Sequence, residues 1–228
     1  MTHEPTPKEL FLKSLASFVH RFKVPLISVL GALLVGLIAL GIIGEIRRNR
    51  LETSTIAIEA IQRDFERWKL ESDSDAKKAL ESSIIANTEE IHSKWQGSYA
   101  NQRAYFIRAE LAYELSDWEA AVENWALLAE NFPDSYLAPV SLMNSAAALE
   151  EMEDFTSAVK TYLKVAEEYS NRSPDEAKDF FSAGRVNEAL GNQEAAIAHY
   201  NSLIDKFPSS DWTKLARDRI IYLQAKED

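Results

Sequence analysis

The chain has 228 residues, 46% of them hydrophobic and 27% charged, which excludes a largely disordered protein, and with only seven glycines and seven prolines it favours long helices over a β-sandwich or barrel. It contains no cysteine, which excludes disulfides, thiol catalysis and cysteine-ligated zinc. Residues 1–44 hold four Lys and Arg against two Glu, a net charge of +2, whereas residues 45–228 hold 21 against 34, a net charge of −13. So acidic a body, with no basic stripe, argues against nucleic acid as a partner.

A short basic tail, residues 1–23, precedes an apolar segment at 24–44. This segment runs for 21 residues without a charge, and as a helix it would be roughly 32 Å long, which matches the hydrocarbon core of a bilayer. A cleaved signal peptide has a shorter apolar run and ends at small residues, whereas here Glu45 and Arg47 follow. The sequence therefore predicts one uncleaved transmembrane helix.

The orientation of this span does not follow from charge. Four Lys and Arg precede it, and four lie within residues 45–64, so the rule that cytoplasmic flanks are basic gives a tie. An anchor near the N-terminus followed by a long body is the usual arrangement of a signal anchor. We therefore expect the body to lie outside the cytoplasm.

Small residues recur within the span at multiples of four positions. Residues so spaced share one helix face and allow a second backbone to approach closely. They predict a packing seam for another transmembrane helix, and with it a possible homo-oligomer. The seam consists of Ser28, Ala32, Gly36 and Gly44.

Residues 45–98 are predicted to form a helical connector. Spacings of three and four residues link the mostly apolar stripe Leu51, Ser54, Ile58, Ile61, Phe65 and Trp68. Fewer than three heptads are too short to define a coiled coil, so the stripe is interpreted either as a coiled-coil seam or as a face that packs on the body of the same chain. The segment 71–75 offers N-cap residues for a second helix that ends near Gly97.

From about residue 99 the chain repeats itself three times, over about 99–135, 136–174 and 175–210, and each unit reads as a helix, a polar turn and a second helix. A final segment, 211–226, is predicted to be a capping helix. Small residues occupy the expected helix crossings, and an aromatic follows each second-helix alanine by four residues. In repeat order these positions are Ala109, Ala146 and Gly184 for the crossing, Ala121, Ala158 and Ala196 for the alanine, and Trp125, Tyr162 and Tyr200 for the aromatic.

These units resemble tetratricopeptide repeats. The spacing of 37 and 38 residues between the key alanines, and the endings NFPDS and KFPSS, are similar to those of bacterial envelope repeat proteins of the Tol-Pal and Bam systems. The order of tail, span, connector and acidic repeats also resembles the ancillary subunit of the Sec translocon. The resemblance implies a helical-hairpin solenoid in a bacterial inner membrane protein, with its repeats in the periplasm and a translocon, chaperone or assembly subunit as partner.

The resemblance also implies a binding groove lined by the first helix of each repeat. In repeats that clamp a peptide's C-terminal carboxylate, one groove position is asparagine or lysine, but here it is Phe106, Met143 and Phe181, so no clamp is expected. An apolar strip edged by mixed charge suits an extended or helical segment with apolar anchors. Alternatively, these three residues pack against the connector helices. The full predicted groove is Phe106, Glu110, Tyr113, Met143, Ala147, Phe181 and Arg185.

No enzyme signature is present. The histidines, at 3, 20, 92 and 199, have no spacing for a metal site or a catalytic triad, and no Gly-rich phosphate loop occurs, so neither a metal nor a cofactor is expected. Two functions remain. The first is a membrane-anchored adaptor that recruits a protein through its groove, and the alternative is a structural subunit that assembles through its span and connector, with the repeats as a spacer or oligomerisation face.

Overall fold

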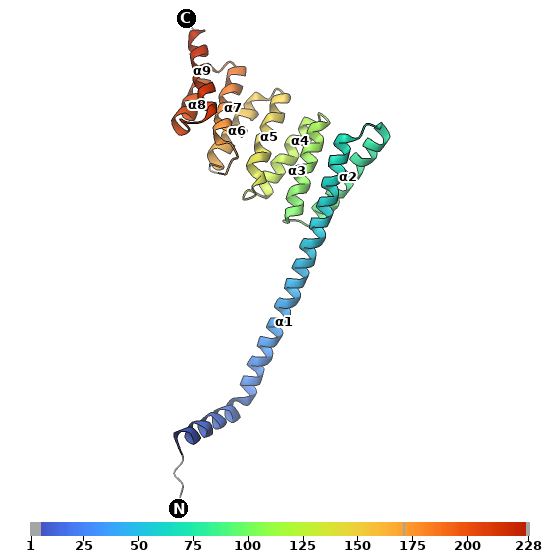
Figure 1. The fold of residues 1–228 in the computed structure, drawn as a ribbon, viewed down its shortest axis with the longest axis vertical. Coiled ribbons are helices and arrows are strands. Elements are labelled where there is room, and N and C mark those ends of the chain that lie inside the picture. The colour runs from blue at the N-terminus through green and yellow to red at the C-terminus, as the bar shows by residue number, and fades with distance from the viewer. Residues whose placement is uncertain (1–5, 171, 227–228) are drawn as a thin grey trace, which may run out of the picture. The chain divides into compact units, whose positions relative to one another are not determined.

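The computed structural model describes residues 6–170 and 172–226, and every regular element in them is an α-helix (Figure 1), which confirms the predicted all-α class. The chain divides into two units, Met1–Glu52 and Thr53–Asp228, and the first helix contributes to both. The nine helices of the described residues are α1 (Pro7–Leu70), α2 (Ser74–Lys94), α3 (Tyr99–Glu114), α4 (Trp118–Asn131), α5 (Leu137–Glu151), α6 (Phe155–Glu168), α7 (Glu176–Ala189), α8 (Gln193–Lys206) and α9 (Asp211–Ala225).

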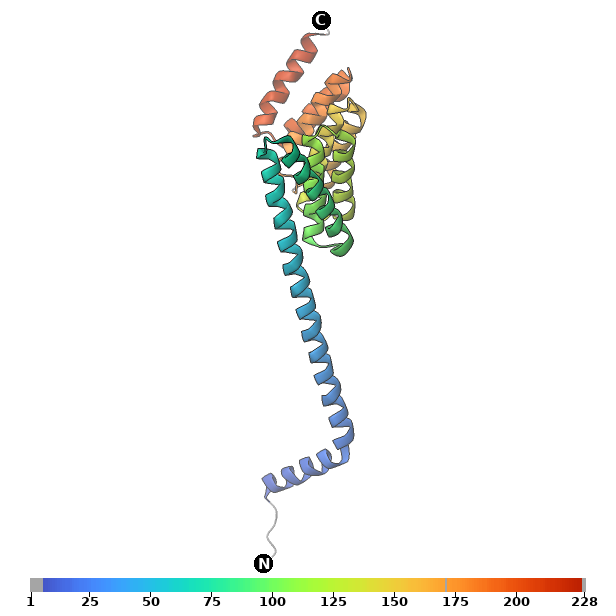
Figure 2. The same cartoon turned by 90° about the vertical axis from the view of Figure 1, so that its right-hand side faces the viewer.

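The first unit consists of the N-terminal part of α1, which is helical from Pro7 and contains Pro25. The helix bends close to this proline, as two perpendicular views show (Figures 1 and 2). A proline inside a helix removes one backbone hydrogen bond and crowds the preceding turn, which accounts for the bend. The residues that precede the apolar segment, interpreted from the sequence as a tail, are therefore helical from Pro7 onward.

The second unit is a stack of helical hairpins in which each helix from α2 to α9 packs against the next (Figure 1). The short turns inside the hairpins share one backbone conformation. Ser116, Glu153 and Gly191 hold corresponding positions in the three turns, and all three have positive φ, between 58° and 75°. Each turn thus reverses the chain through a left-handed residue, although only the third uses glycine, which adopts this conformation without steric cost.

In the first two hairpins, the residue that follows the turn caps the second helix with its side chain, whereas Asn192 in the third makes no such hydrogen bond. Asp117 accepts a hydrogen bond from the backbone N–H of Ala120, and Asp154 accepts the equivalent bond from Ser157. Such caps satisfy N–H groups that have no partner within the helix. Local sequence therefore sets where the helices of the hairpins start, before any tertiary contact is considered.

Close helix crossings hold each hairpin together at the positions predicted to be small. Ala109 and Ala146 are fully buried, as are Ala121, Ala158 and Ala196. The third crossing is tighter, because a Cβ added to Gly184 would lie 2.5 Å from a ring carbon of Tyr200. Glycine is needed there to admit the tyrosine ring.

The connector stripe packs on the body of the same chain. Ile58, Ile61, Phe65 and Trp68 of α1 are at most 4% exposed and form one cluster with apolar residues of α2 and α3. Leu51, in the first unit, is instead exposed. Residues 53–70 and α2 thus act as a further helical pair that covers the apolar face of the first repeat, as a solenoid requires at its ends.

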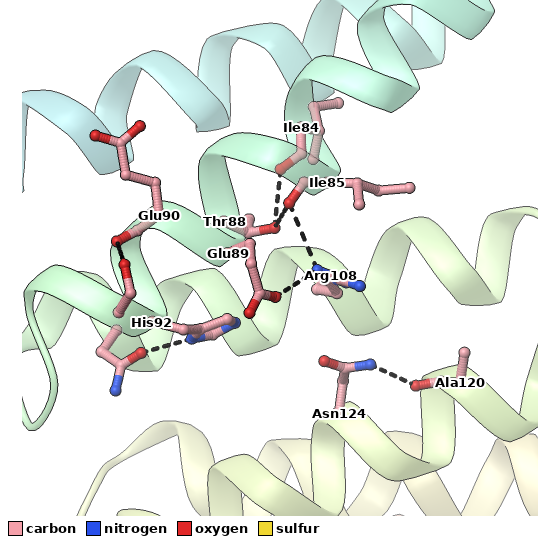
Figure 3. A network of polar contacts seen from close by, with 11 residues as sticks. Ile84, Ile85, Thr88, Glu89, Glu90, His92, Arg108, Ala120 and Asn124 are labelled. Carbon is pink, nitrogen blue, oxygen red and sulfur yellow. Dashed lines mark hydrogen bonds and ion pairs between the residues drawn. The ribbon is translucent and has the colours of Figure 1, made fainter.

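Polar contacts fasten α2 to α3 beside this cluster (Figure 3). Arg108 of α3 forms an ion pair with Glu89 at 3.4 Å and also donates to the carbonyl oxygen of Ile85. One turn further along α2, Nδ1 of His92 lies 2.6 Å from Oδ1 of Asn101. α2 ends at Lys94, with Trp95 as its C-cap, slightly earlier than the sequence indicated.

Candidate functional site

The predicted groove residues lie on the first helices of the three hairpins, but the apolar ones do not form one exposed strip. Phe106 is only 8% exposed and shares a cluster of the first two repeats with the half-buried Met143. Phe181 lies in a separate cluster, with its ring centroid 5.5 Å from that of Tyr200 and 5.2 Å from that of Trp212. None of the three belongs to the cluster that the connector stripe forms. All three pack against neighbouring residues of the repeats, and whether they also contact a partner stays a prediction.

Three other predicted residues do come together. Glu110 and Tyr113 of α3 and Ala147 of α5 border a single hollow of about 220 Å³. Trp125 of α4 lies in its wall, and Phe65, which the sequence assigned to the connector, closes one side. Lys69, Glu114 and Asn144 complete the lining.

The hollow exists because a contact found at the later repeat boundaries is missing at this one. In the second hairpin, Tyr162 donates to Glu150 at 2.9 Å, and Arg185 of the next hairpin pairs with the same carboxylate at 2.6 Å. We call this arrangement, in which a tyrosine and the arginine of the following element share one glutamate, the latch. Arg185, predicted to contact a partner, therefore pairs with a glutamate of its own chain, although its side chain stays about half exposed.

The third hairpin repeats the latch. Tyr200 donates to Glu188, and Arg219 of α9 binds both oxygens of that carboxylate. Burial alone would raise the pKa of Glu188, but the hydrogen bonds from Arg219 and Tyr200 outweigh it and lower the pKa. Burial and the neighbouring carboxylates raise the pKa values of Tyr162 and Tyr200, so both hydroxyls remain protonated donors.

At the first boundary all three latch positions carry other residues. The register of the repeats places Tyr113 at the glutamate position, Trp125 at the tyrosine position and Ala147 at the arginine position. Tyr113 and Trp125 meet as aromatic neighbours with centroids 5.6 Å apart. Among the described residues, Nε1 of Trp125 has no hydrogen-bond partner, although the side chain is only 2% exposed. The small Ala147 leaves the space that arginine fills at the next boundary.

Glu110 gives the hollow its electrostatic character. Burial raises the pKa of this carboxyl above its ordinary value, while the positive charges of Arg103 and Lys69 oppose the effect. Lys69 is itself paired with Glu66 at 2.8 Å and lies over the ring of Phe65 at 4.7 Å. A partly desolvated carboxylate beside three aromatic rings favours a ligand that brings positive charge or a hydrogen-bond donor.

The predicted transmembrane seam lies on α1. Ser28, Ala32, Gly36 and Gly44 are all exposed, and no side chain of the described residues approaches the position of a Cβ on either glycine. By length and composition, this part of α1 is apolar enough to cross a membrane, with a mean hydropathy of 2.6 over its most apolar window and none of that window buried. Whether the seam packs against another helix stays a prediction.

No group of three or more His, Asp or Glu side chains in the part of the chain that the structure describes is placed to hold a metal ion. His92 and His199 lie far apart on α2 and α8, and burial lowers the pKa of each. His3 lies outside the described residues.

Comparison with known proteins agrees with this architecture. Residues 103–135 and 144–211 each match a family model described as a tetratricopeptide repeat. A "TPR repeat-containing protein" of Treponema pallidum (strain Nichols) is 30% identical over 145 residues, which are 63% of this chain and 60% of that relative. Over these two stretches the stacked hairpins are therefore similar to tetratricopeptide repeats, the helical hairpin units from which solenoid proteins are built.

Sequence reasoning placed Glu110, Tyr113 and Ala147 in the groove but missed Trp125 and Phe65 as parts of it. The sequence does contain a signal for the latch, since a glutamate precedes the key tyrosine by 12 residues in the second and third repeats but not in the first. The missing glutamate in the first repeat predicts a hollow only if one knows that Tyr113, Trp125 and Ala147 lie next to one another. Only the packing of α3, α4 and α5 shows this.

Proposed function

We propose that this protein is a membrane-anchored interaction protein whose repeats capture a segment of a partner protein in the hollow at the first repeat boundary. The observation that carries the proposal is the missing latch. The later boundaries are closed by a shared glutamate. This boundary instead has Ala147 and a Trp125 Nε1 with no partner in the described part of the chain, beside a space of about 220 Å³. Binding residues of interfaces are typically a few large side chains in such pockets.

The chemistry of the lining indicates the kind of anchor that would fit. Phe65, Tyr113 and Trp125 supply aromatic surface, while Glu110 and Glu114 supply carboxylates. A side chain with an apolar stem and a positive end satisfies both, because it covers the rings and pairs with the acid. We therefore propose that a lysine or arginine of the partner segment enters the hollow, with neighbouring apolar residues of the partner covering its rim.

The proposal is tested by a substitution that places a large side chain of the protein itself in the hollow. In the full-length chain, Ala147→Arg should reduce capture of the partner from detergent-solubilised membranes by about tenfold or more, as expected for loss of a central binding contact. Ala198→Arg, the same change at an exposed position of α8, is the matched control. A protein counts as the partner only if the first variant loses it and the second retains it. Equal recovery of every captured protein by both variants would contradict the proposal and favour a structural role for the span and its seam.

The cellular setting is part of the proposal. We propose that residues 24–44 cross the inner membrane of a bacterium once and place the repeats in the periplasm, as the resemblance to envelope repeat proteins implies. A translocon, chaperone or envelope-assembly subunit is then the expected kind of partner. Protease added to intact spheroplasts should digest the repeats. If the repeats were protected until the membrane is lysed, the orientation would be reversed. The proposal of periplasmic partners would then be wrong as well.

A further inference from the structure

The helix that precedes Pro25 is amphipathic. At 100° per residue, its large apolar side chains occupy an arc of about 120°, and its polar and basic side chains occupy the opposite side. Lys8 and Leu10, in the first turn, depart from this division. The apolar side consists of Phe11, Leu12, Leu15, Phe18, Val19 and Phe22, and the polar side of Lys13, Ser14, Ser17, His20, Arg21 and Lys23.

The apolar side has no cover within the described residues. Its six side chains are between 40% and 67% exposed. The rings of Phe18 and Phe22 pack against each other with centroids 4.8 Å apart, so they present a joint apolar surface rather than isolated side chains. A continuous apolar surface of this kind is unfavourable in water and indicates that something covers it.

The charge of this helix and its position in the chain indicate what covers its apolar side. Residues 8–23 hold four Lys and Arg against one Glu, a net charge of +3, and three of those cations lie on the polar side. Basic residues at the surface of an anionic leaflet are attracted to it. A helix with Phe and Leu on one face and Lys and Arg on the other is typical of helices that lie in the plane of a membrane interface.

The helix is also continuous with the apolar segment 24–44. The amphipathic stretch runs directly into that segment, whose second residue is Pro25, and α1 bends close to this proline (Figure 2). We propose that residues 8–23 lie along the surface of an anionic leaflet, with Phe11, Leu15 and Phe18 among the upper acyl chains and Arg21 and Lys23 among the headgroups. The bend at Pro25 then turns the chain from the membrane plane into the span. This inference rests on the proposed membrane anchoring.

The absence of cysteine allows single labels to test the geometry in the full-length protein. Leu15→Cys and Ser17→Cys, which point to opposite sides of the helix, would each carry an environment-sensitive fluorophore. The protein would be reconstituted in vesicles of phosphatidylcholine with or without phosphatidylglycerol. Lipids brominated near the headgroup should quench the label at residue 15 about threefold more strongly than the label at residue 17, because an interfacial helix buries its apolar face by about 5–10 Å. The difference should grow with phosphatidylglycerol.

A third label separates the two proposals. Val35→Cys lies within the apolar segment and should be quenched by lipids brominated near the end of the acyl chains. Deep quenching at residue 35 with equal quenching at residues 15 and 17 would overturn the in-plane helix and leave the anchor intact. A label at residue 35 that fluoresces as in water and is not quenched by these lipids would contradict the proposed membrane anchoring itself. Replacing Arg21 and Lys23 with glutamine should remove the dependence on phosphatidylglycerol, and an unchanged dependence would contradict the role assigned to the basic side.

Discussion

At the scale of single residues, the protein keeps one carboxyl group in an unusual state. Asp179, in the first turn of α7, is fully buried, and one of its oxygens accepts a hydrogen bond from Ser173 at 2.7 Å. Its other oxygen has no partner among the described residues. Burial raises the pKa of Asp179 to about 7 and outweighs the hydrogen bond from Ser173, which lowers it; the negative charges of Asp175 and Glu176 make smaller upward contributions.

This shift predicts how stability depends on pH. The ordinary pKa is 3.8, so the folded state holds the proton more tightly than the unfolded chain, and the unfolding free energy should fall as pH rises from about 4 to about 7. Asp179→Asn should flatten that slope and raise the unfolding free energy at pH 8, by an amount on the order of 2 kcal/mol. Denaturant melts across this range would measure both effects.

Asp154→Asn is the control for this prediction. Asp154 caps α6, and hydrogen bonds to Ser157 lower its pKa, so it is already ionised at pH 4 and above in the folded protein. Asparagine also caps helices well. The slope between pH 5 and 7 should therefore persist in this variant. A slope that remains in Asp179→Asn as well would show that another group titrates in this window.

At the scale of helices, the latch determines how successive hairpins are joined. Tyr162 and Tyr200 each donate a hydrogen bond to a glutamate that an arginine of the following element also binds. The arginines are partly exposed, so water screens the charge, and the buried tyrosine hydroxyls are the stronger part of the contact. The first boundary relies instead on the contact between Tyr113 and Trp125.

Removing a latch hydroxyl should therefore weaken the interface between a hairpin and the element that follows it. Tyr162→Phe and Tyr200→Phe should each lower the unfolding free energy by about 1 kcal/mol, the usual value of a hydrogen bond to a partly buried side chain. Tyr222→Phe on α9, where the ring is 53% exposed, is the control and should change little. Unchanged thermal midpoints for both latch variants would mean that the contacts are incidental.

At the scale of the whole molecule, the second unit depends on a stretch that belongs to the same helix as the apolar segment 24–44. Ile58, Ile61, Phe65 and Trp68 of α1 cover Ile84 and Ile91 of α2 and the adjoining face of α3. Without residues 53–70 this apolar surface would meet water. The repeats and their cap are therefore incomplete without the end of α1.

A comparison of two soluble fragments tests this dependence. Residues 53–228 should form a helical protein that unfolds cooperatively, because they contain every cluster of the second unit. A fragment of residues 72–228 should be less stable by several kcal/mol, on the order expected when several large core side chains are lost. Circular dichroism melts would measure the difference. Equal midpoints would show that the end of α1 rests on the body without stabilising it.

The sequence by itself determined the all-α class, the three repeats and their small crossing residues, because these follow from local helix periodicity, capping residues and a repeated spacing. It also identified the stripe from Leu51 to Trp68, of which Leu51 stays exposed, but not which of two surfaces the rest would contact. Tertiary structure decided that it packs on α2 and α3, that Phe106 is buried rather than presented, and that Arg185 is held by Glu150. The hollow beside Ala147 depends on residues of α1, α3, α4 and α5, which lie up to 82 positions apart, from Phe65 to Ala147. Helix periodicity reports only which face of a helix is apolar, whereas a pocket depends on how several faces meet.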